Sequence, residues 1–224
     1  MAAFSSEFAK DAARARKILE VFTRNGPAQQ AASQADVDTS AGKPDERTAG
    51  QRLAAALTEL GTTWVKLGQS LSMRPDLVGA QTAGELESLQ ASVPADAPGL
   101  ARARVARELR KPVADLFASF DDEPFASGSV AQAHRAGLND GTPAVVKVLH
   151  DGADKRVASD LSLMRRLAAY AEGVDPETAQ FDPVGVVEQF SKMMTEAVDL
   201  QNELRNMQRL REALVDQDWL IVPR

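Results

Sequence analysis

The feature that most constrains the fold is a strand–turn–strand pattern in the middle of the chain. Apolar and small residues dominate 130–138 and 143–149, and the tripeptide Asn-Asp-Gly at 139–141 separates them. These three residues tolerate the positive φ angles that a tight hairpin turn requires. A further strand is expected over 115–121, which would complete an antiparallel meander. The sequence therefore predicts a small antiparallel sheet with Lys147 on its last strand.

Helical periodicity lies on both sides of this sheet. Leucines and Trp64 recur at spacings of three and four over 50–72, which predicts one helix there. Arg74-Pro75 ends it, because proline has no N–H and disfavours helical angles in the residue before it. Further helices are expected over 80–91, 97–110, 154–172 and 182–214, and 219–223 has the composition of one more strand. The predicted fold class is α+β.

The first 49 residues divide into two parts. Residues 3–24 carry apolar side chains interleaved with Lys and Arg, so residues 1–25 are predicted to form an amphipathic helix. This helix either packs on the surface of the domain or lies along a membrane surface. Residues 26–49 contain almost no large apolar side chains, which is typical of a flexible linker.

The composition excludes several classes of function. A net charge of −6 over 224 residues does not supply the clustered Lys and Arg that nucleic-acid binding requires. The chain has no cysteine, which excludes disulfides and cysteine zinc sites. His134 and His150 have no metal-ligand spacing, so no metal site is expected. With no secretory signal and no membrane-spanning window expected, we predict a cytoplasmic protein that contacts membranes peripherally at most.

Three groups of residues together indicate a nucleotide-binding lobe. Lys66 and Gln69 project from one face of a helix because they are three residues apart. The small residues at 126–129 would let backbone N–H groups approach phosphate oxygens closely. Lys147 would contact the α- and β-phosphates, oriented by a carboxylate on the following helix, for which Glu203 is the candidate. For Lys147 alone, an edge-strand lysine that faces water is the alternative.

The motifs of residues 50–224 resemble, in order and spacing, those of the UbiB/AarF/ADCK family of atypical kinases. Lys66-Leu67-Gly68-Gln69 matches its KxGQ motif, and Lys147 matches its nucleotide lysine. Ala126-Ser127-Gly128-Ser129 matches the Ala-rich loop that replaces the kinase Gly-rich loop. Asp199 falls on the end of the family's ExD segment, and Glu203 falls on its helix-C glutamate.

The resemblance implies a protein-kinase-like N-lobe over 112–224, an antiparallel sheet plus a long helix C, after an α-helical KxGQ extension over 50–111. It implies ATP with Mg²⁺ as cofactor, held by Ala126, Ser127, Gly128, Ser129, Lys147 and Glu203, with Lys66, Gln69 and Asp199 covering the site. It also implies a link to isoprenoid-quinone biosynthesis, with quinone-precursor lipids or quinone-biosynthesis proteins as candidate partners.

The chain departs from the family pattern at three places. Ala197 stands where the ExD segment has its glutamate, which leaves the partner of Lys66 open, and Gly128 stands where the loop has alanine. No residues match the catalytic-loop Asp and Asn or the DFG Asp, so the C-lobe is expected to be missing and no catalytic residue is assigned. Two functions remain. The chain is either the nucleotide-binding part of an atypical kinase or ATPase, inactive alone, or a non-catalytic regulatory module that retains the lobe.

Overall fold

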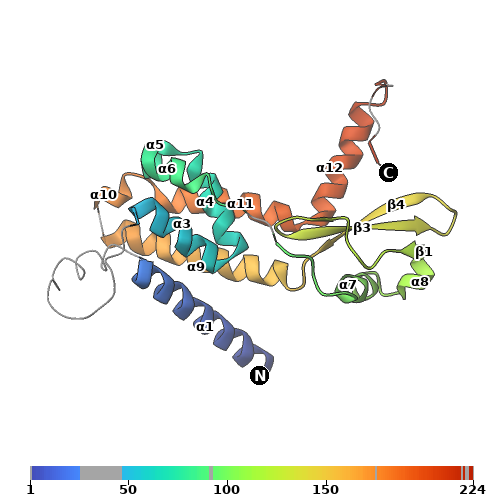
Figure 1. Cartoon of the computed structure of the whole chain (residues 1–224), viewed down its shortest axis with the longest axis horizontal. Coiled ribbons are helices and arrows are strands. Elements are labelled where there is room, and N and C mark those ends of the chain that lie inside the picture. The colour runs from blue at the N-terminus through green and yellow to red at the C-terminus, as the bar shows by residue number, and fades with distance from the viewer. Residues whose placement is uncertain are drawn as a thin grey trace. The chain divides into compact units, whose positions relative to one another are not determined.

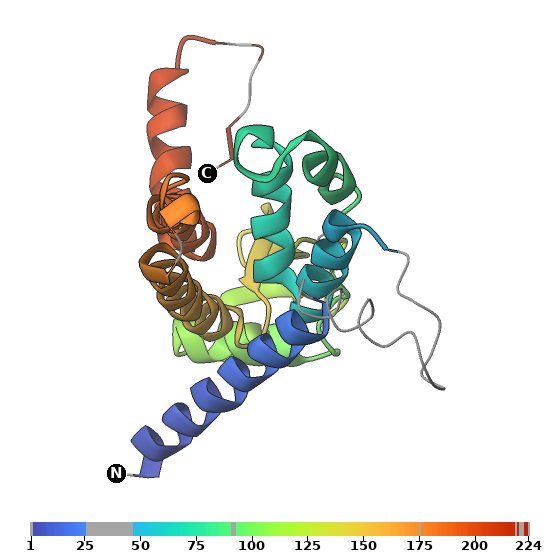
Figure 2. The same cartoon turned by 90° about the vertical axis from the view of Figure 1, so that its left-hand side faces the viewer.

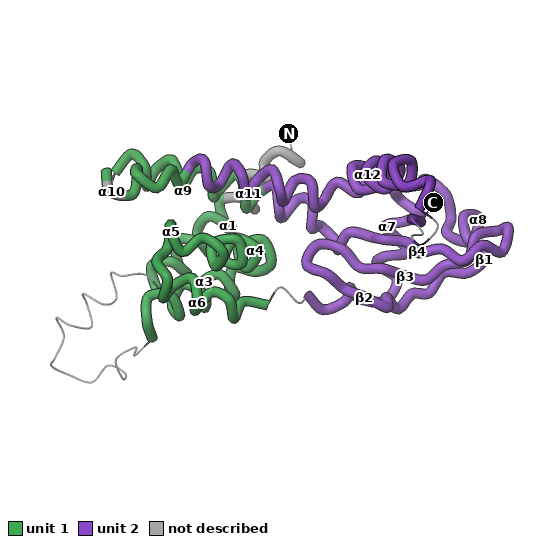
Figure 3. The backbone as a smooth tube through the Cα atoms, turned by 90° about the horizontal axis from the view of Figure 1, so that it is seen from above, with its two compact units in different colours: residues 1–92, 159–183 green, residues 93–158, 184–224 purple. Residues whose placement is uncertain are grey.

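The computed structural model describes residues 2–25, 47–90, 93–174, 176–217, 219 and 222–223. It divides into unit 1, residues 1–92 and 159–183, and unit 2, residues 93–158 and 184–224 (Figure 3). The elements are α1 (Ala2–Asn25), α3 (Ala49–Leu60), α4 (Thr62–Ser72), α5 (Pro75–Val78), α6 (Ala80–Leu86), α7 (Leu100–Leu109), α8 (Val113–Leu116), β1 (Phe117–Phe120), β2 (Ala126–Ser127), β3 (Ala131–Leu138), β4 (Pro143–Leu149), α9 (Ala153–Val174), α10 (Pro176–Ala179), α11 (Pro183–Val198) and α12 (Leu200–Ala213) (Figure 1). Among the described helices, none combines the length and apolar character needed to cross a bilayer.

Unit 1 is built from helices whose apolar faces pack together. α3 contacts α1, α4 and α6 (Figure 2, blue to green). Deeply buried apolar side chains of unit 1 come from these four helices and from α9: Ile18, Val21, Ala56, Leu57, Leu60, Trp64, Leu86, Leu161 and Met164. Because Ile18 and Val21 are almost fully buried, the second half of α1 packs within unit 1, which supports the surface-packed interpretation of this amphipathic helix.

Two of the expected helices are interrupted. The single helix predicted over 50–72 is wrong at Gly61, whose φ of 95° and ψ of −168° break the helix into α3 and α4. The helix predicted over 182–214 is broken at Asp199, between α11 and α12. Apolar spacing continues across both breaks, so periodicity alone does not reveal them. The predicted linker lies mostly on 26–46, outside the described residues, as does much of the strand expected at 219–223.

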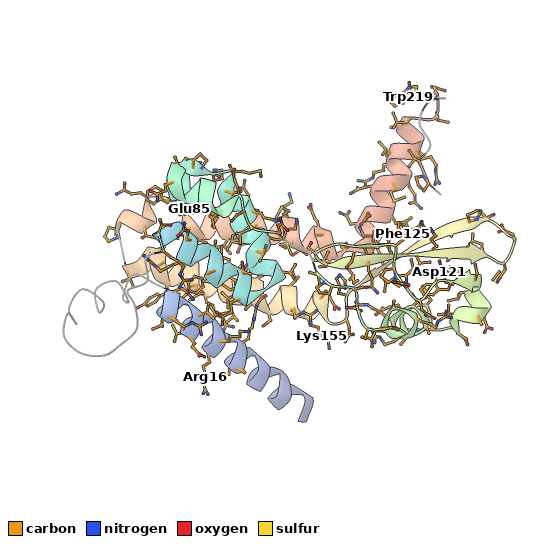
Figure 4. The ribbon with its side chains drawn as sticks, in the orientation of Figure 1. Arg16, Glu85, Asp121, Phe125, Lys155 and Trp219 are labelled. Carbon is orange, nitrogen blue, oxygen red and sulfur yellow. The ribbon has the colours of Figure 1, made fainter. Side chains whose placement is uncertain are left out.

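The sheet of unit 2 is organised around β3. β4 pairs with β3 along its whole length, and both β1 and β2 also pair with β3. A strand has two edges, so β1 and β2 share the edge opposite β4. Between them, Asp121 and Phe125, labelled in Figure 4, keep backbone bonds to β3. The predicted meander is therefore confirmed, but its first strand starts at Phe117 and not at 115, because 113–116 form the helical turn α8. The short strand β2 is an addition to the prediction, since it lies at 126–127, where the sequence predicted a turn.

One face of this sheet is covered by α7. Ala101 and Val105 of α7 form a buried cluster with Phe120, Ala136 and Val148 of the strands. Side chains alternate between the two faces of a strand. Val148 points to α7, and Lys147 therefore projects from the opposite face.

Candidate functional site

A row of small side chains runs across the sheet to Lys147. In the observed register Ala126 of β2 is opposite Ala133 of β3, and Ala133 is opposite Lys147 of β4. Residues that are opposite one another in a sheet project from the same face. At a strand spacing of about 4.8 Å, the backbones of Ala126 and Lys147 lie about 10 Å apart. Because alanine side chains are short, no large side chain of this row covers the sheet backbone between the loop and Lys147.

Lys147 forms the predicted ion pair with Glu203. Its Nζ donates to Oε1 at 2.8 Å and to Oε2 at 2.6 Å, which confirms the expected contact. The two side chains are 46% and 44% exposed, so solvent screening limits the contribution of the pair to stability to about 0–1 kcal/mol. A lysine ammonium has three N–H donors. Both Glu203 oxygens lie on one side of the ammonium, so donor capacity remains for another anionic acceptor.

Asp199 and Glu203 both belong to the start of α12. Asp199 is the N-cap of this helix, and its Oδ1 accepts the backbone N–H of Asn202 at 3.0 Å. Its other oxygen, Oδ2, lies 3.4 Å from Arg205 Nη2. A capping carboxylate stabilises the first helical turn by satisfying N–H groups that have no partner within the helix. Asp199 therefore fixes the turn that carries Glu203.

The loop at 126–129 is exposed at Ala126, Ser127 and Gly128 and is held from below by polar bonds. Ser127 Oγ donates to the carbonyl of Val93 at 2.8 Å. The Gly128 N–H donates to the carbonyl of Ala131 at 2.8 Å, and the Gly128 carbonyl lies 3.0 Å from His150 Nε2. The loop is thus an exposed turn whose lower side is fixed by residues from two other segments.

Sequence reasoning missed the polar network beneath this loop. Asp96 belongs to the segment of unit 2 that precedes α7. Its backbone N–H donates to Gln132 Oε1 at 2.9 Å. Its carboxylate contacts His150 Nδ1 at 3.1 Å. Gln132 Nε2 contacts His134 Nε2 at 3.0 Å, and His134 Nδ1 contacts the Asp121 carbonyl at 2.7 Å. Asp96 and His150 are 54 residues apart, and no local spacing could have linked them.

Lys66 and Gln69 lie on α4, in unit 1, whereas the loop, Lys147, Glu203 and Asp199 belong to unit 2. Gln69 Nε2 donates to the carbonyl of Leu89 at 2.9 Å. The expectation that the Lys66/Gln69 face covers the loop involves both units and stays a prediction. No group of three His, Cys, Asp or Glu side chains placed to hold a metal occurs among the described residues, so none is assigned to Mg²⁺.

Comparison with known proteins agrees with this architecture. The family model of the ABC1 atypical kinase-like domain matches residues 88–224, more than half of the chain. A "Probable protein kinase UbiB" of Cellvibrio japonicus (strain Ueda107) is 41% identical over 174 residues, covering 78% of this chain and 32% of that protein. Proteins of the same name from Pseudomonas paraeruginosa (strain DSM 24068 / PA7) and Aliivibrio fischeri (strain ATCC 700601 / ES114) are 39% and 38% identical over 178 and 182 residues. These two alignments cover 80% and 81% of this chain and 33% and 34% of the relatives.

The chain thus spans about a third of the length of the curated relatives it matches. The matched part contains the antiparallel sheet, α12 and the Lys147–Glu203 pair, which is the arrangement expected of a protein-kinase-like N-lobe. The predicted α+β fold and the predicted family are both confirmed. This chain belongs to the ABC1 atypical kinase-like family.

Proposed function

We propose that unit 2 binds the phosphates of ATP on the sheet face that carries Lys147, as the nucleotide-binding part of an atypical kinase or ATPase. The observation that carries the proposal is the pairing of Lys147 with both oxygens of Glu203. In kinases generally, a strand lysine oriented by a helix glutamate contacts the α- and β-phosphates. The donor capacity of Lys147 that Glu203 does not use would meet a phosphate oxygen.

The loop supplies the second contact. The small side chains of Ala126, Ser127, Gly128 and Ser129 would let phosphate oxygens approach the loop backbone closely, although the Gly128 N–H is already bonded to the Ala131 carbonyl. The alanine row from Ala126 to Lys147 leaves the sheet surface low between the two contacts. A bound Mg²⁺ would neutralise phosphate charge, and the nucleotide itself would supply its ligands on this side of the site.

Family membership extends the proposal from nucleotide binding to a biological role. The resemblance stated above suggests a kinase or ATPase linked to isoprenoid-quinone biosynthesis, with quinone-precursor lipids or quinone-biosynthesis proteins as partners. In this proposal 112–224 form the lobe, 50–111 form the KxGQ extension, and Lys66, Gln69 and Asp199 cover the nucleotide. Phosphoryl transfer also requires a positioned base and metal-binding carboxylates. We therefore expect no Mg²⁺-dependent ATP turnover above background from residues 1–224.

Nucleotide binding tests the proposal directly. Wild-type protein should show a thermal shift at millimolar ATP that Lys147→Ala abolishes. Lys155→Ala is the matched control, because Lys155 is also an exposed lysine of unit 2 but lies on α9. Replacing a half-exposed lysine alters stability by only about 0.5 kcal/mol, so loss of the shift would not reflect unfolding.

Two results would count against the proposal. If wild type and Lys147→Ala respond equally to ATP, the pair is structural and the regulatory-module interpretation is favoured. If turnover is measured and disappears in Lys147→Ala, this chain carries chemistry that the assignment omits.

A further inference from the structure

His150 occupies a position in which both of its ring nitrogens face hydrogen-bond acceptors. The residue is 2% exposed and directly follows β4. Nε2 lies 3.0 Å from the carbonyl oxygen of Gly128, and Nδ1 lies 3.1 Å from Oδ1 of Asp96. A neutral imidazole carries one N–H and cannot donate to both. Only the doubly protonated ring satisfies the two bonds.

The surroundings of Asp96 are consistent with a carboxylate that accepts. Its Oδ2 accepts the backbone N–H of Asp151 at 2.9 Å, so both oxygens already receive hydrogen bonds. Ser127 Oγ, which lies 3.5 Å from His150 Nε2, donates its proton to Val93. The hydroxyl oxygen is then a second, weaker acceptor on the Nε2 side of the ring.

His134, the other histidine of the chain, provides a contrast. Its Nδ1 faces the carbonyl of Asp121, and its Nε2 faces the side-chain amide nitrogen of Gln132. One acceptor and one donor suit a neutral ring with its proton on Nδ1. For both ring nitrogens to be hydrogen-bonded, His134 needs one ring proton and His150 needs two.

Other charged groups approach His150 from α7 and α9. Arg104 Nη1 of α7 donates to the backbone carbonyl of His150 at 2.9 Å. Arg104 Nη2 lies 3.5 Å from Asp154 of α9, and Arg104 Nε lies 3.9 Å from Glu108. The arginine thus has its own carboxylate partners, and Asp96 is the carboxylate in contact with the imidazole ring.

We propose that His150 is a proton-dependent brace on the loop at 126–129; the inference rests on the proposed function in taking this loop as the phosphate-binding one. When the ring carries two protons, it holds the Gly128 carbonyl and keeps the loop in its present shape. When one proton is lost, the anionic Asp96 retains the other on Nδ1, because bonds to charged acceptors are the stronger. The Nε2 lone pair then repels the Gly128 oxygen.

Ser127 completes the exchange between the two states. In the unprotonated state Nε2 becomes an acceptor, and the Ser127 hydroxyl is the donor within reach. Turning toward Nε2 removes the Ser127 proton from the Val93 carbonyl. One deprotonation therefore changes two of the bonds that fix the loop from below, and His150 acts as a positioning residue for the phosphate contacts.

The test is a pH titration of the full chain by NMR without nucleotide. Nitrogen-detected spectra resolve the two histidines, and the amide of Ser129 reports on the Gly128 carbonyl, with which it shares a peptide unit. Across the range of about pH 5–8, in which histidine side chains ordinarily change charge, the brace requires His150 to change from two ring protons to one. The Ser129 signal should shift in step, while His134 keeps its proton on Nδ1.

Asp96→Asn is the decisive variant. An asparagine can accept from the Asp151 N–H with its oxygen and donate to Nδ1 of a neutral ring with its nitrogen. Nε2 then keeps its proton for Gly128 at every pH, so the Ser129 signal should no longer respond to pH. His150 neutral throughout the range, or a Ser129 signal in wild type that ignores the His150 titration, would overturn the brace.

Nucleotide binding forms a separate arm. If the loop binds phosphate, the ATP affinity of wild type should fall several-fold across the His150 titration, and that of Asp96→Asn should not. Absence of ATP binding at any pH, with the NMR coupling intact, would refute the proposed function and leave the brace standing. ATP affinity that is independent of pH in wild type would show that the brace does not act on phosphate binding.

Discussion

Gly68, the glycine of the KxGQ motif, is predicted to be required for packing. A Cβ added at this position would lie 2.3 Å from Leu89 Cδ1 and 2.7 Å from Leu57 Cδ1. Both leucines are buried, so neither methyl group has free space into which to move. Gly68→Ala therefore introduces an overpacked contact between α4 and its neighbours in unit 1.

The expected magnitude follows from two opposing effects. Overpacking a core by one methyl group destabilises by about 1–3 kcal/mol, whereas replacing a helix-interior glycine by alanine stabilises by about 1 kcal/mol. Gly68→Ala should therefore lower the free energy of unfolding by about 0–2 kcal/mol. Gly84→Ala on α6 is the matched control, because an added Cβ there meets nothing within 4 Å. That variant should gain about 1 kcal/mol from helix propensity alone.

The difference between Gly68→Ala and Gly84→Ala is the quantity to measure. Urea unfolding can be followed by fluorescence of the buried Trp64 in a Trp219→Phe background, since Trp219 is exposed. In Gly68→Ala/Leu89→Ala the new methyl group enters the space that Leu89 vacates, so the double variant should be about 1 kcal/mol more stable than additivity predicts. If Gly68→Ala is as stabilising as Gly84→Ala, the close contact of Gly68 with Leu57 and Leu89 is refuted.

Three further predictions concern unit 2. Gly128→Ala should fold normally and gain about 0.4–1 kcal/mol, because the added Cβ would lie 3.4 Å from the Ala131 carbonyl and Gly128 has no positive φ; a cooperative loss in thermal unfolding would contradict this. Asp199→Ala should destabilise α12 by about 1 kcal/mol through loss of its cap, while Asp199→Asn should retain it, as measured by amide exchange in the first turn. The Thr142 N–H lowers the pKa of the Asp140 carboxyl below its ordinary value. The ionised carboxylate therefore stabilises the hairpin at pH values above the ordinary pKa of aspartate. In an NMR titration this stabilisation should be lost as the pH falls through the lowered pKa of Asp140. In Asp140→Asn, which has no carboxyl group, the hairpin signals should not change over the same pH range.

The hairpin and the ion pair could be predicted from the sequence because their signals are local or belong to a motif. β4 begins and ends where the apolar run at 143–149 predicts, and the turn at 139–141 contains Gly141 with a φ of 88°. The Lys147–Glu203 contact joins residues 56 apart, but the family motif names both.

The helix breaks and the polar network could not be predicted in the same way. Gly61 interrupts a stretch whose leucines keep helical spacing on both sides, and the break appears only in its φ angle. Asp199 was identified as a motif residue, yet its capping bond depends on where α12 begins. Asp96 and His150 are brought together only by tertiary structure. Their roles arise from tertiary contacts that leave no pattern in the sequence.

The central position of β3 has a consequence for the order of folding. β1, β2 and β4 all pair with β3 and not with one another, so no part of the sheet can form before β3 is in place. The β3–β4 hairpin closes a four-residue loop, whereas the β1 and α12 contacts close longer ones, and loop closure is entropically cheaper for short loops. We therefore expect the hairpin to form first, so that Lys147 reaches its final position on the sheet before Glu203 arrives to meet it.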